Sequence, residues 1–153
     1  MHRSSKKAPA EKRIQYAALP YRVNAGARTE VLLITSRQTR RWIIPKGWPH
    51  KDKDKDKAPH RSAAREAFEE AGVTGAVGRR SIGSFSHHKR LKNGGVVTCK
   101  VLVFPLKVDR QDKRWPEKEE RQLRWLSAQR AARTVKHPQL SEIIDRLARA
   151  NFG

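Results

Sequence analysis

The chain has very little cysteine and no long apolar run. The first shortage argues against a disulfide-rich protein, and the second argues against a membrane-spanning one. Its single cysteine, Cys99, excludes an intramolecular disulfide framework and is typical of reducing compartments. No stretch approaches the roughly 20 apolar residues that cross a bilayer, and no signal-peptide core is present. The sequence therefore predicts a cytoplasmic location and no membrane partner.

Acidic residues are also scarce, at 15 against 35 lysines and arginines, which gives a net charge of +20. Such a field attracts polyanions, either nucleic acid, anionic lipid or small polyphosphates. The 153 residues, 37% of them hydrophobic, suffice for one domain with a core. We expect a disordered basic tail over residues 1–13 and a single domain over residues 14–153.

The few acids that are present gather at one place. Glu66, Glu69 and Glu70 stand at i, i+3 and i+4, so on a helix they share one face. Packed carboxylates repel one another, and a hard divalent cation relieves that repulsion. The spacing is therefore typical of a Mg²⁺ or Mn²⁺ site, although by itself it also occurs on solvated helix faces. Gly72 follows where a helix would end.

The context of these acids resembles a known family signature. Residues 65–73 read R-E-A-F-E-E-A-G-V, and upstream lies W-I-I-P-K-G-W-P over residues 42–49. Together they resemble the Nudix hydrolase signature, G-x5-E-x7-R-E-U-x-E-E-x-G-U, in which U is an apolar residue. The helical half of the signature is complete.

The first half departs from the pattern. Gly47 and Arg65 stand 18 positions apart where the family has 14, and the position of the remaining family Glu falls on Lys57. The intervening run is K-D-K-D-K-D-K, so Asp52, Asp54 or Asp56 either replaces that Glu or belongs to a solvated loop. This departure concerns the outer part of the metal site.

The resemblance implies a fold, a reaction and a set of roles. The fold is an α/β/α sandwich with a mixed sheet and helices on both faces. The reaction is Mg²⁺-dependent hydrolysis of a diphosphate bond, by a Nudix-type pyrophosphohydrolase. Glu66, Glu69, Glu70 and the Gly47 carbonyl would hold the metal, and Arg65 would orient the glutamates through a bidentate pair. The base would be Glu66 or Glu69, or Glu120 outside the signature.

Local patterns independently fit this architecture. Pro59 suits the first position of a helix that ends at Ala71, and Pro20 is expected to place the end of the first strand at an edge or bulge. Residues 107–120 read as a charged loop. The remaining expectations are strands over 14–23, 31–35, 42–44, 81–88, 96–106 and 122–126, and helices over 127–135 and 140–148.

The substrate is left open by the signature. Pro45-Lys46-Gly47 resembles the branch that cleaves diphosphoinositol polyphosphates and diadenosine polyphosphates, whose substrates are highly anionic. The alternatives are a pyrophosphohydrolase acting on RNA 5′ ends and a nucleic-acid-binding protein that has kept only the fold. The intact glutamates argue against the last. The oligomeric state is unknown. Candidate phosphate ligands are Arg40, Arg41, Lys46, Lys89, Arg90 and Lys92.

Overall fold

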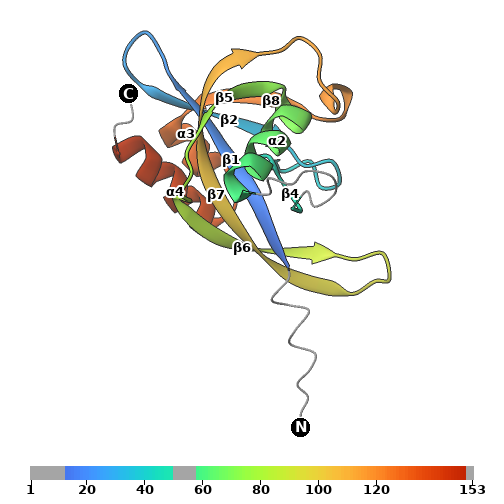
Figure 1. The fold of residues 1–153 in the computed structure, drawn as a ribbon. Helices are drawn as coiled ribbons and strands as arrows, with labels where there is room; N and C mark the ends of the chain where they lie inside the picture. The colour runs from blue at the N-terminus through green and yellow to red at the C-terminus, as the bar shows by residue number, and fades with distance from the viewer. Residues whose placement is uncertain (1–12, 50–57, 151–153) are drawn as a thin grey trace.

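One mixed eight-stranded sheet forms the centre of the computed structural model, which describes residues 13–49 and 58–150. Its main path runs β3-β2-β1-β7-β5, with β4 paired to β1, β6 to β7 and β8 to β2 (Figure 1). β1 and β7 are parallel and all the other pairs are antiparallel. The strands are β1 (Ile14–Val23), β2 (Thr29–Thr35), β3 (Trp42–Ile43), β4 (Lys46–Gly47), β5 (Val73–Val77), β6 (Gly83–Arg90), β7 (Val96–Gln111) and β8 (Leu123–Ser127).

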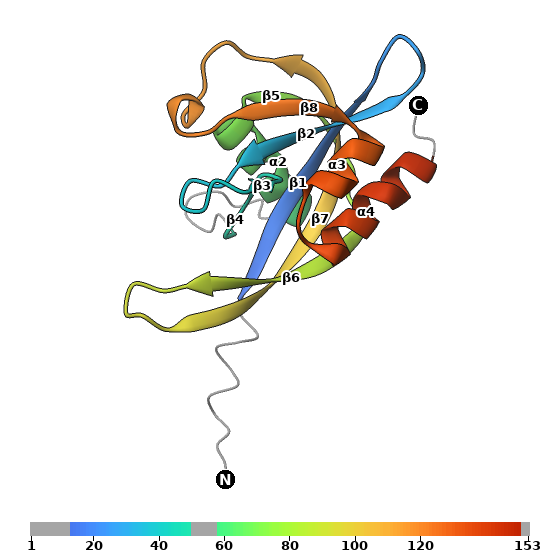
Figure 2. The ribbon, with the colours of Figure 1, turned by 180° about the vertical axis from the view of Figure 1, so that it is seen from behind.

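Helices cover both faces of this sheet. α2 (Pro59–Ala71) lies on one face, and α3 (Ala128–Thr134) and α4 (Pro138–Arg149) lie on the other, as Figures 1 and 2 show from opposite sides. The short 3₁₀ helix η2 (Lys118–Glu120) precedes β8. The expected α/β/α sandwich with helices on both faces is thus confirmed. The Lys-Asp run, with Lys57, and most of the basic tail lie outside the described residues.

Two apolar cores result because the central strands bury both of their faces. Along β2, Val31 and Leu33 pack under α3 and α4, whereas Leu32 and Ile34 pack under α2. Continuous apolar runs of this kind are what a strand between two helical layers requires. Each fully buried Leu or Ile side chain contributes about 1.5–3 kcal/mol of transfer free energy.

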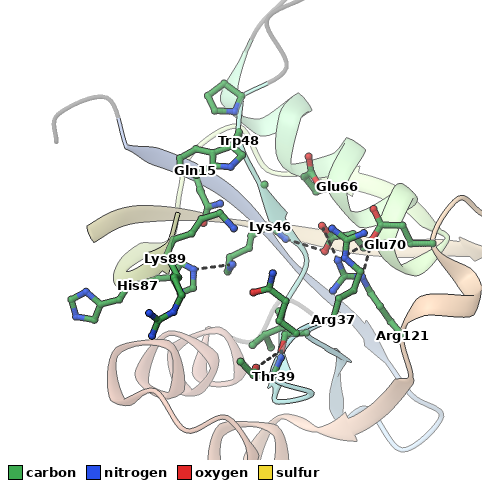
Figure 3. A pocket seen from close by; sticks show the side chains of 18 of the residues that line it. Gln15, Arg37, Thr39, Lys46, Trp48, Glu66, Glu70, His87, Lys89 and Arg121 are labelled. Atoms are coloured by element: carbon green, nitrogen blue, oxygen red, sulfur yellow. Dashed lines mark hydrogen bonds and ion pairs between the residues drawn. The ribbon is translucent and has the colours of Figure 1, made fainter. Parts of the chain in front are cut away.

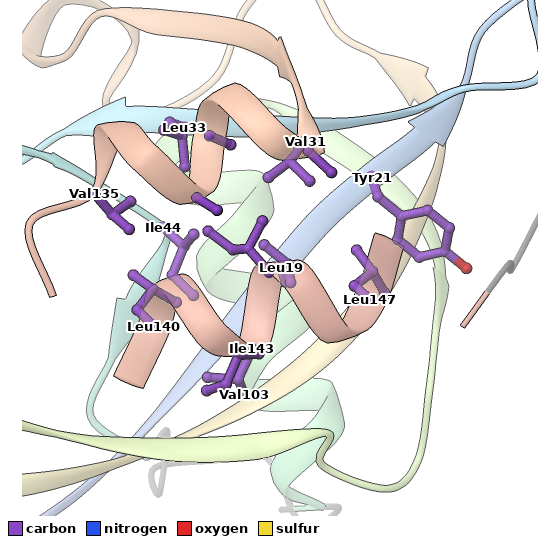
Figure 4. Packing of buried hydrophobic residues seen from close by; sticks show 14 of the residues in the cluster. Leu19, Tyr21, Val31, Leu33, Ile44, Val103, Val135, Leu140, Ile143 and Leu147 are labelled. Atoms are coloured by element: carbon purple, nitrogen blue, oxygen red, sulfur yellow. The ribbon is translucent and has the colours of Figure 1, made fainter. Parts of the chain in front are cut away.

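α4 illustrates how the outer layer is attached. Its buried side chains recur at the i, i+3, i+4 and i+7 spacing of one helix face and cover Leu19 and Val103 of the sheet (Figure 4). That face is apolar because it is the inner face, and it is therefore structural. The four side chains are Leu140, Ile143, Ile144 and Leu147.

Three details differ from the sequence-based expectations. β1 runs through the middle of the sheet, and Pro20 is tolerated there because pairing with β4 ends at Ala17 and pairing with β2 begins at Tyr21. Residues 107–111 extend β7 instead of starting a loop, because β5 pairs with them. Short β5, with its Thr-Gly-Ala centre, shows too weak an apolar pattern to be predicted.

The helix that bears the acids begins and ends where the sequence predicts. Pro59 occupies its first turn, and Gly72 ends it with a φ of 71°, in the left-handed region. The Gly72 N–H donates to the Phe68 carbonyl at 2.9 Å. Within the described residues, no helix is long and apolar enough to cross a membrane.

Candidate active site

A single cavity of about 770 Å³ receives side chains from strands, from α2 and from three loops (Figure 3). The glutamates of α2 lie on one side with Arg37 and Arg121 close to them, whereas Lys46 and Lys89 lie toward the other side. The charged lining residues are Arg37, Lys46, Glu66, Glu70, Lys89, Arg90, Glu117 and Arg121.

Two of the three helical glutamates are buried against the turn at Gly47. Glu66 is 7% exposed and Glu70 is 5% exposed. A Cβ atom at residue 47 would collide with the Glu66 carboxyl group, so only glycine allows the backbone to approach this closely. The Lys46 backbone N–H donates to Oε1 of Glu70 at 3.3 Å, which ties β4 to the helix.

The electrostatics of this pair suit a cation. Burial raises the pKa of Glu70 to about 9, with Arg121 opposing the rise and the neighbouring Glu66 adding to it. Two buried carboxylates side by side are unfavourable when both are charged, and a divalent cation relieves that repulsion. Mg²⁺ usually takes only one or two protein carboxylates and completes its shell with water and phosphate. Glu66, Glu70 and the Gly47 carbonyl therefore fit such an ion, although no cluster of three or more His, Cys, Asp or Glu side chains occurs in the described ranges.

The third glutamate faces elsewhere. Glu69 accepts one hydrogen bond from Nε of Arg65, at 3.2 Å, and its side chain is 30% exposed. The family resemblance implied a bidentate pair for Arg65. The structure shows a single contact instead, between residues one helical turn apart. Glu69 does not line the cavity. Its metal and base roles stay predictions.

Arg121 is a site residue that sequence reasoning missed. Its side chain is 7% exposed and lies 2.8 Å from Glu117 and 3.6 Å from Glu70. It also donates to the Thr35 carbonyl at 3.0 Å. A buried guanidinium with these partners holds the two carboxylates in place. The available signal was the Glu-Arg spacing of four residues just before the last strand.

Glu117 occupies the position that was expected for Glu120. Glu117 lines the cavity, whereas Glu120 does not and is 45% exposed in an ion pair with Arg37, at 2.8 Å. Glu117 stands at the N-cap of the short 3₁₀ helix, and Glu120 is the last residue of that helix. By position, the carboxylate outside the signature that reaches the cavity is Glu117, whereas Glu120, predicted as a candidate base at the start of the last strand, does not line it.

The loop that carries Glu117 is fixed to the end of α2. The Glu117 N–H donates to the Glu69 carbonyl at 3.0 Å, and the Asp112 N–H donates to the Gly72 carbonyl at 2.8 Å. Trp115 packs where a side chain at residue 72 would stand. These bonds satisfy carbonyls that a helix end leaves without partners, and they position Glu117 and Arg121 beside the glutamates.

Only some of the predicted phosphate ligands reach the cavity. Lys46, Lys89 and Arg90 line it, joined by Arg37, which the sequence did not single out. The other three, Arg40, Arg41 and Lys92, are not among its lining residues. Their role as phosphate ligands stays a prediction from the sequence.

Lys46 and His87 meet inside the cavity. Nζ of Lys46 lies 3.3 Å from Nε2 of His87 (Figure 3). Burial lowers the pKa of Lys46, with Glu70 opposing, while burial and then the charge of Lys46 lower the pKa of His87 to about 4. The imidazole is therefore neutral near pH 7 and accepts a hydrogen bond from the ammonium group.

The comparisons with known proteins agree with this fold and site. Residues 15–147 match the NUDIX domain model, so the chain belongs to the Nudix family. It is 32% identical to Nudix hydrolase 16, mitochondrial, of Arabidopsis thaliana. The similarity extends over 125 residues, which are 78% of this chain and 66% of the relative. The chain spans 60% of a second plant relative, Nudix hydrolase 21, chloroplastic, at 31% identity over 131 residues, which are 82% of this chain.

One further relative bears on the branch of the family, and one solved structure bears on the fold. A stretch of 65 residues is 42% identical to the Bos taurus diphosphoinositol polyphosphate phosphohydrolase 3-beta, covering 42% of this chain and 37% of that protein. The crystal structure of a C. elegans Ap4A hydrolase superposes with a TM-score of 0.61 at 18% identity, covering 90% of this chain and 96% of that one. The second likeness concerns the fold alone.

Proposed function

We propose that this chain hydrolyses a diphosphate bond in a highly anionic substrate, either a diphosphoinositol polyphosphate or a dinucleoside polyphosphate, with Mg²⁺ or Mn²⁺. One observation carries the proposal. A single cavity places two buried carboxylates at one end and the cations Lys46, Lys89 and Arg90 at the other. The first set suits a divalent cation and the second suits phosphoryl oxygens.

The division of work among the side chains follows from their positions. Glu66, Glu70 and the Gly47 carbonyl would hold the cation, which neutralises phosphate charge and lowers the pKa of a coordinated water. Lys46 is placed between the carboxylates and the hairpin, because its backbone bonds Glu70 and its ammonium group enters the cavity. Lys89 and Arg90 would bind the more distant phosphates.

Three carboxylates are candidates for the general base. Glu66 is the candidate inside the signature that faces the cavity, and Glu69 becomes one only if it leaves Arg65. Glu117 joins them because it lines the cavity, where it also forms an ion pair with Arg121 at 2.8 Å. Variants Glu66→Gln, Glu69→Gln and Glu117→Gln, compared by the pH dependence of turnover, separate these choices.

A phosphate-release assay over a substrate panel tests the proposal. The panel holds diphosphoinositol polyphosphates, dinucleoside polyphosphates, a nucleotide sugar and triphosphorylated RNA, each with Mg²⁺ and with a chelator. We expect Mg²⁺-dependent turnover, with kcat/KM rising with phosphate number. Turnover restricted to triphosphorylated RNA would overturn the assignment, and so would turnover that survives chelation. The cytoplasmic location stays a prediction from the sequence.

A further inference from the structure

At one end of the sheet, on the face that α3 and α4 cover, the apolar core gives way to polar side chains. On β1, Gln15 lies two residues before the buried Ala17 and four before Leu19, so its side chain points to the same side of the strand. On β6, His87 lies two residues after the buried Phe85 and points to the same side of that strand. Lys46 joins them because β4 pairs it with Ala17. We call Gln15, Lys46 and His87 the polar floor of the cavity.

Gln15 is the unexpected member of the polar floor. It is 3% exposed, it lines the cavity, and its Oε1 atom has no hydrogen-bond partner among the described residues. Buried polar groups of native proteins are nearly always paired, so an unpaired one calls for a ligand or a water molecule. The unpaired oxygen needs a donor, and the NH2 group that a flip would put in its place needs an acceptor, so a partner able to do either fits both orientations of the amide. A hydroxyl group is such a partner.

Lys46 adds a cation beside this amide. Its ammonium group has three donors, and the contact to His87 uses one of them. His87 accepts that bond as a neutral group, so it orients the ammonium without cancelling its charge, as a carboxylate would. The free donors of Lys46 suit a phosphoryl oxygen, and Figure 3 shows Gln15, Lys46 and His87 on one side of the cavity.

We propose that Gln15, Lys46 and His87 form a subsite that binds a free ring hydroxyl group one or two carbons away from a phosphorylated carbon of the substrate. Gln15 is the residue that reads the hydroxyl, Lys46 binds the adjacent phosphate, and His87 is a positioning residue for Lys46. This rests on the proposed function. Two sources offer that chemistry, the ribose of a nucleotide and an inositol ring with one unphosphorylated position, whereas a fully phosphorylated ring does not.

Equilibrium binding tests the hydroxyl directly. Methylene-bridged, non-hydrolysable analogues are measured by calorimetry with Mg²⁺ in two pairs, a dinucleoside polyphosphate against its 3′-deoxyribose form, and a diphosphoinositol with one free hydroxyl against the same ring deoxygenated there. We expect the wild-type protein to bind the hydroxylated member of at least one pair about tenfold more tightly, the value of a good neutral hydrogen bond. The pair that shows the preference identifies the source.

Gln15→Leu then assigns that preference to the amide. The variant should bind both members of the pair with the affinity that the wild type has for the member without the hydroxyl. Its thermal midpoint should not fall, because Oε1 of Gln15 makes no hydrogen bond to the described residues. Gln129→Leu, an exposed glutamine on α3, is the matched control and should keep the preference. Equal binding of both members by the wild type, or an equal loss for both in Gln15→Leu, would overturn the subsite.

His87 is tested by rescue. His87→Leu should weaken binding of both members alike, since it releases Lys46, while His87→Gln should restore most of the affinity because it offers a neutral acceptor. Equal weakening by both variants would refute the positioning role. None of these binding measurements needs turnover. Absence of hydrolysis would overturn the proposed function, whereas the hydroxyl preference is decided by binding alone.

Discussion

The two ends of the cavity are built in opposite ways. At the carboxylate end, the two buried glutamates come from one short segment, because Glu66 and Glu70 lie one turn apart on α2, while the fold brings Gly47 and Arg121 against them. The basic and polar end is assembled from β1, β4, β6 and the hairpin, which the sheet brings together. The chemistry of the site is thus encoded locally, while the recognition of a substrate depends on long-range strand pairing.

Removing Arg121 should disturb the carboxylate end most. In Arg121→Ala, two carboxylates lose the guanidinium that pairs them in a buried place, so we expect a loss of about 3–5 kcal/mol in the free energy of unfolding, measured with urea. Arg121→Leu combined with Glu117→Gln should lose much less, because Glu117 is neutral there and burial disfavours the charged form of the remaining partner, Glu70. A single-variant loss below about 1 kcal/mol would show that the pair is not effectively buried.

Replacing Glu70 should separate catalysis from folding at the same end. Glu70→Gln keeps the shape but removes the charge that would hold the cation, so we expect kcat to fall by roughly 10² or more. The thermal midpoint should stay or rise, since the charged form of this buried carboxyl is disfavoured. Exposed Glu142→Gln is the control. Near-normal turnover in Glu70→Gln would refute the metal assignment.

The basic end should respond in KM. Lys89 and Arg90 would bind phosphate in the ground state and the transition state alike, so replacing both by Ala should raise KM by roughly tenfold and change kcat little. The effect should shrink with added salt, because exposed charges are screened over about 8 Å at physiological ionic strength. Arg133 and Lys136, remote and exposed, give the matched double-alanine control. A fall in kcat as large as the rise in KM would contradict this division.

The smallest expected effect is a pH dependence of stability at the polar floor. The pKa of His87 is about 4 in the folded protein, below its ordinary value of 6.5, so between these pH values the unfolded state binds more protons. The free energy of unfolding should therefore fall as the pH is lowered through this window. We expect a loss of about 1 kcal/mol, less than the full shift implies, because the imidazole is only half-buried.

His87→Gln removes the titrating group and should flatten that dependence, measured as urea midpoints between pH 4 and 7. The exposed neighbour His88→Gln is the control and should leave the slope unchanged. A slope that persists in His87→Gln would place its origin in another group.

Local sequence determined α2, its ends and its acids. Proline at the first turn, glycine at the left-handed end and carboxylates at i and i+4 act within a few residues, so a periodic pattern suffices to predict them. The central strands and the inner face of α4 were predictable for a similar reason, because burial on two sides or on one face leaves a periodicity.

Tertiary structure alone decided the rest of the site. Which glutamate of the loop before β8 faces the cavity depends on distant partners, since Glu117 is bonded to the end of α2 through its backbone whereas Glu120 pairs with Arg37. Gln15 gives no signal in the sequence. Its importance arises only in the fold, where β1 lies between β4 and β7 and the amide of Gln15 is buried with its oxygen unpaired. Periodicity records which side of an element is buried, but it does not record which distant residue will lie across from it.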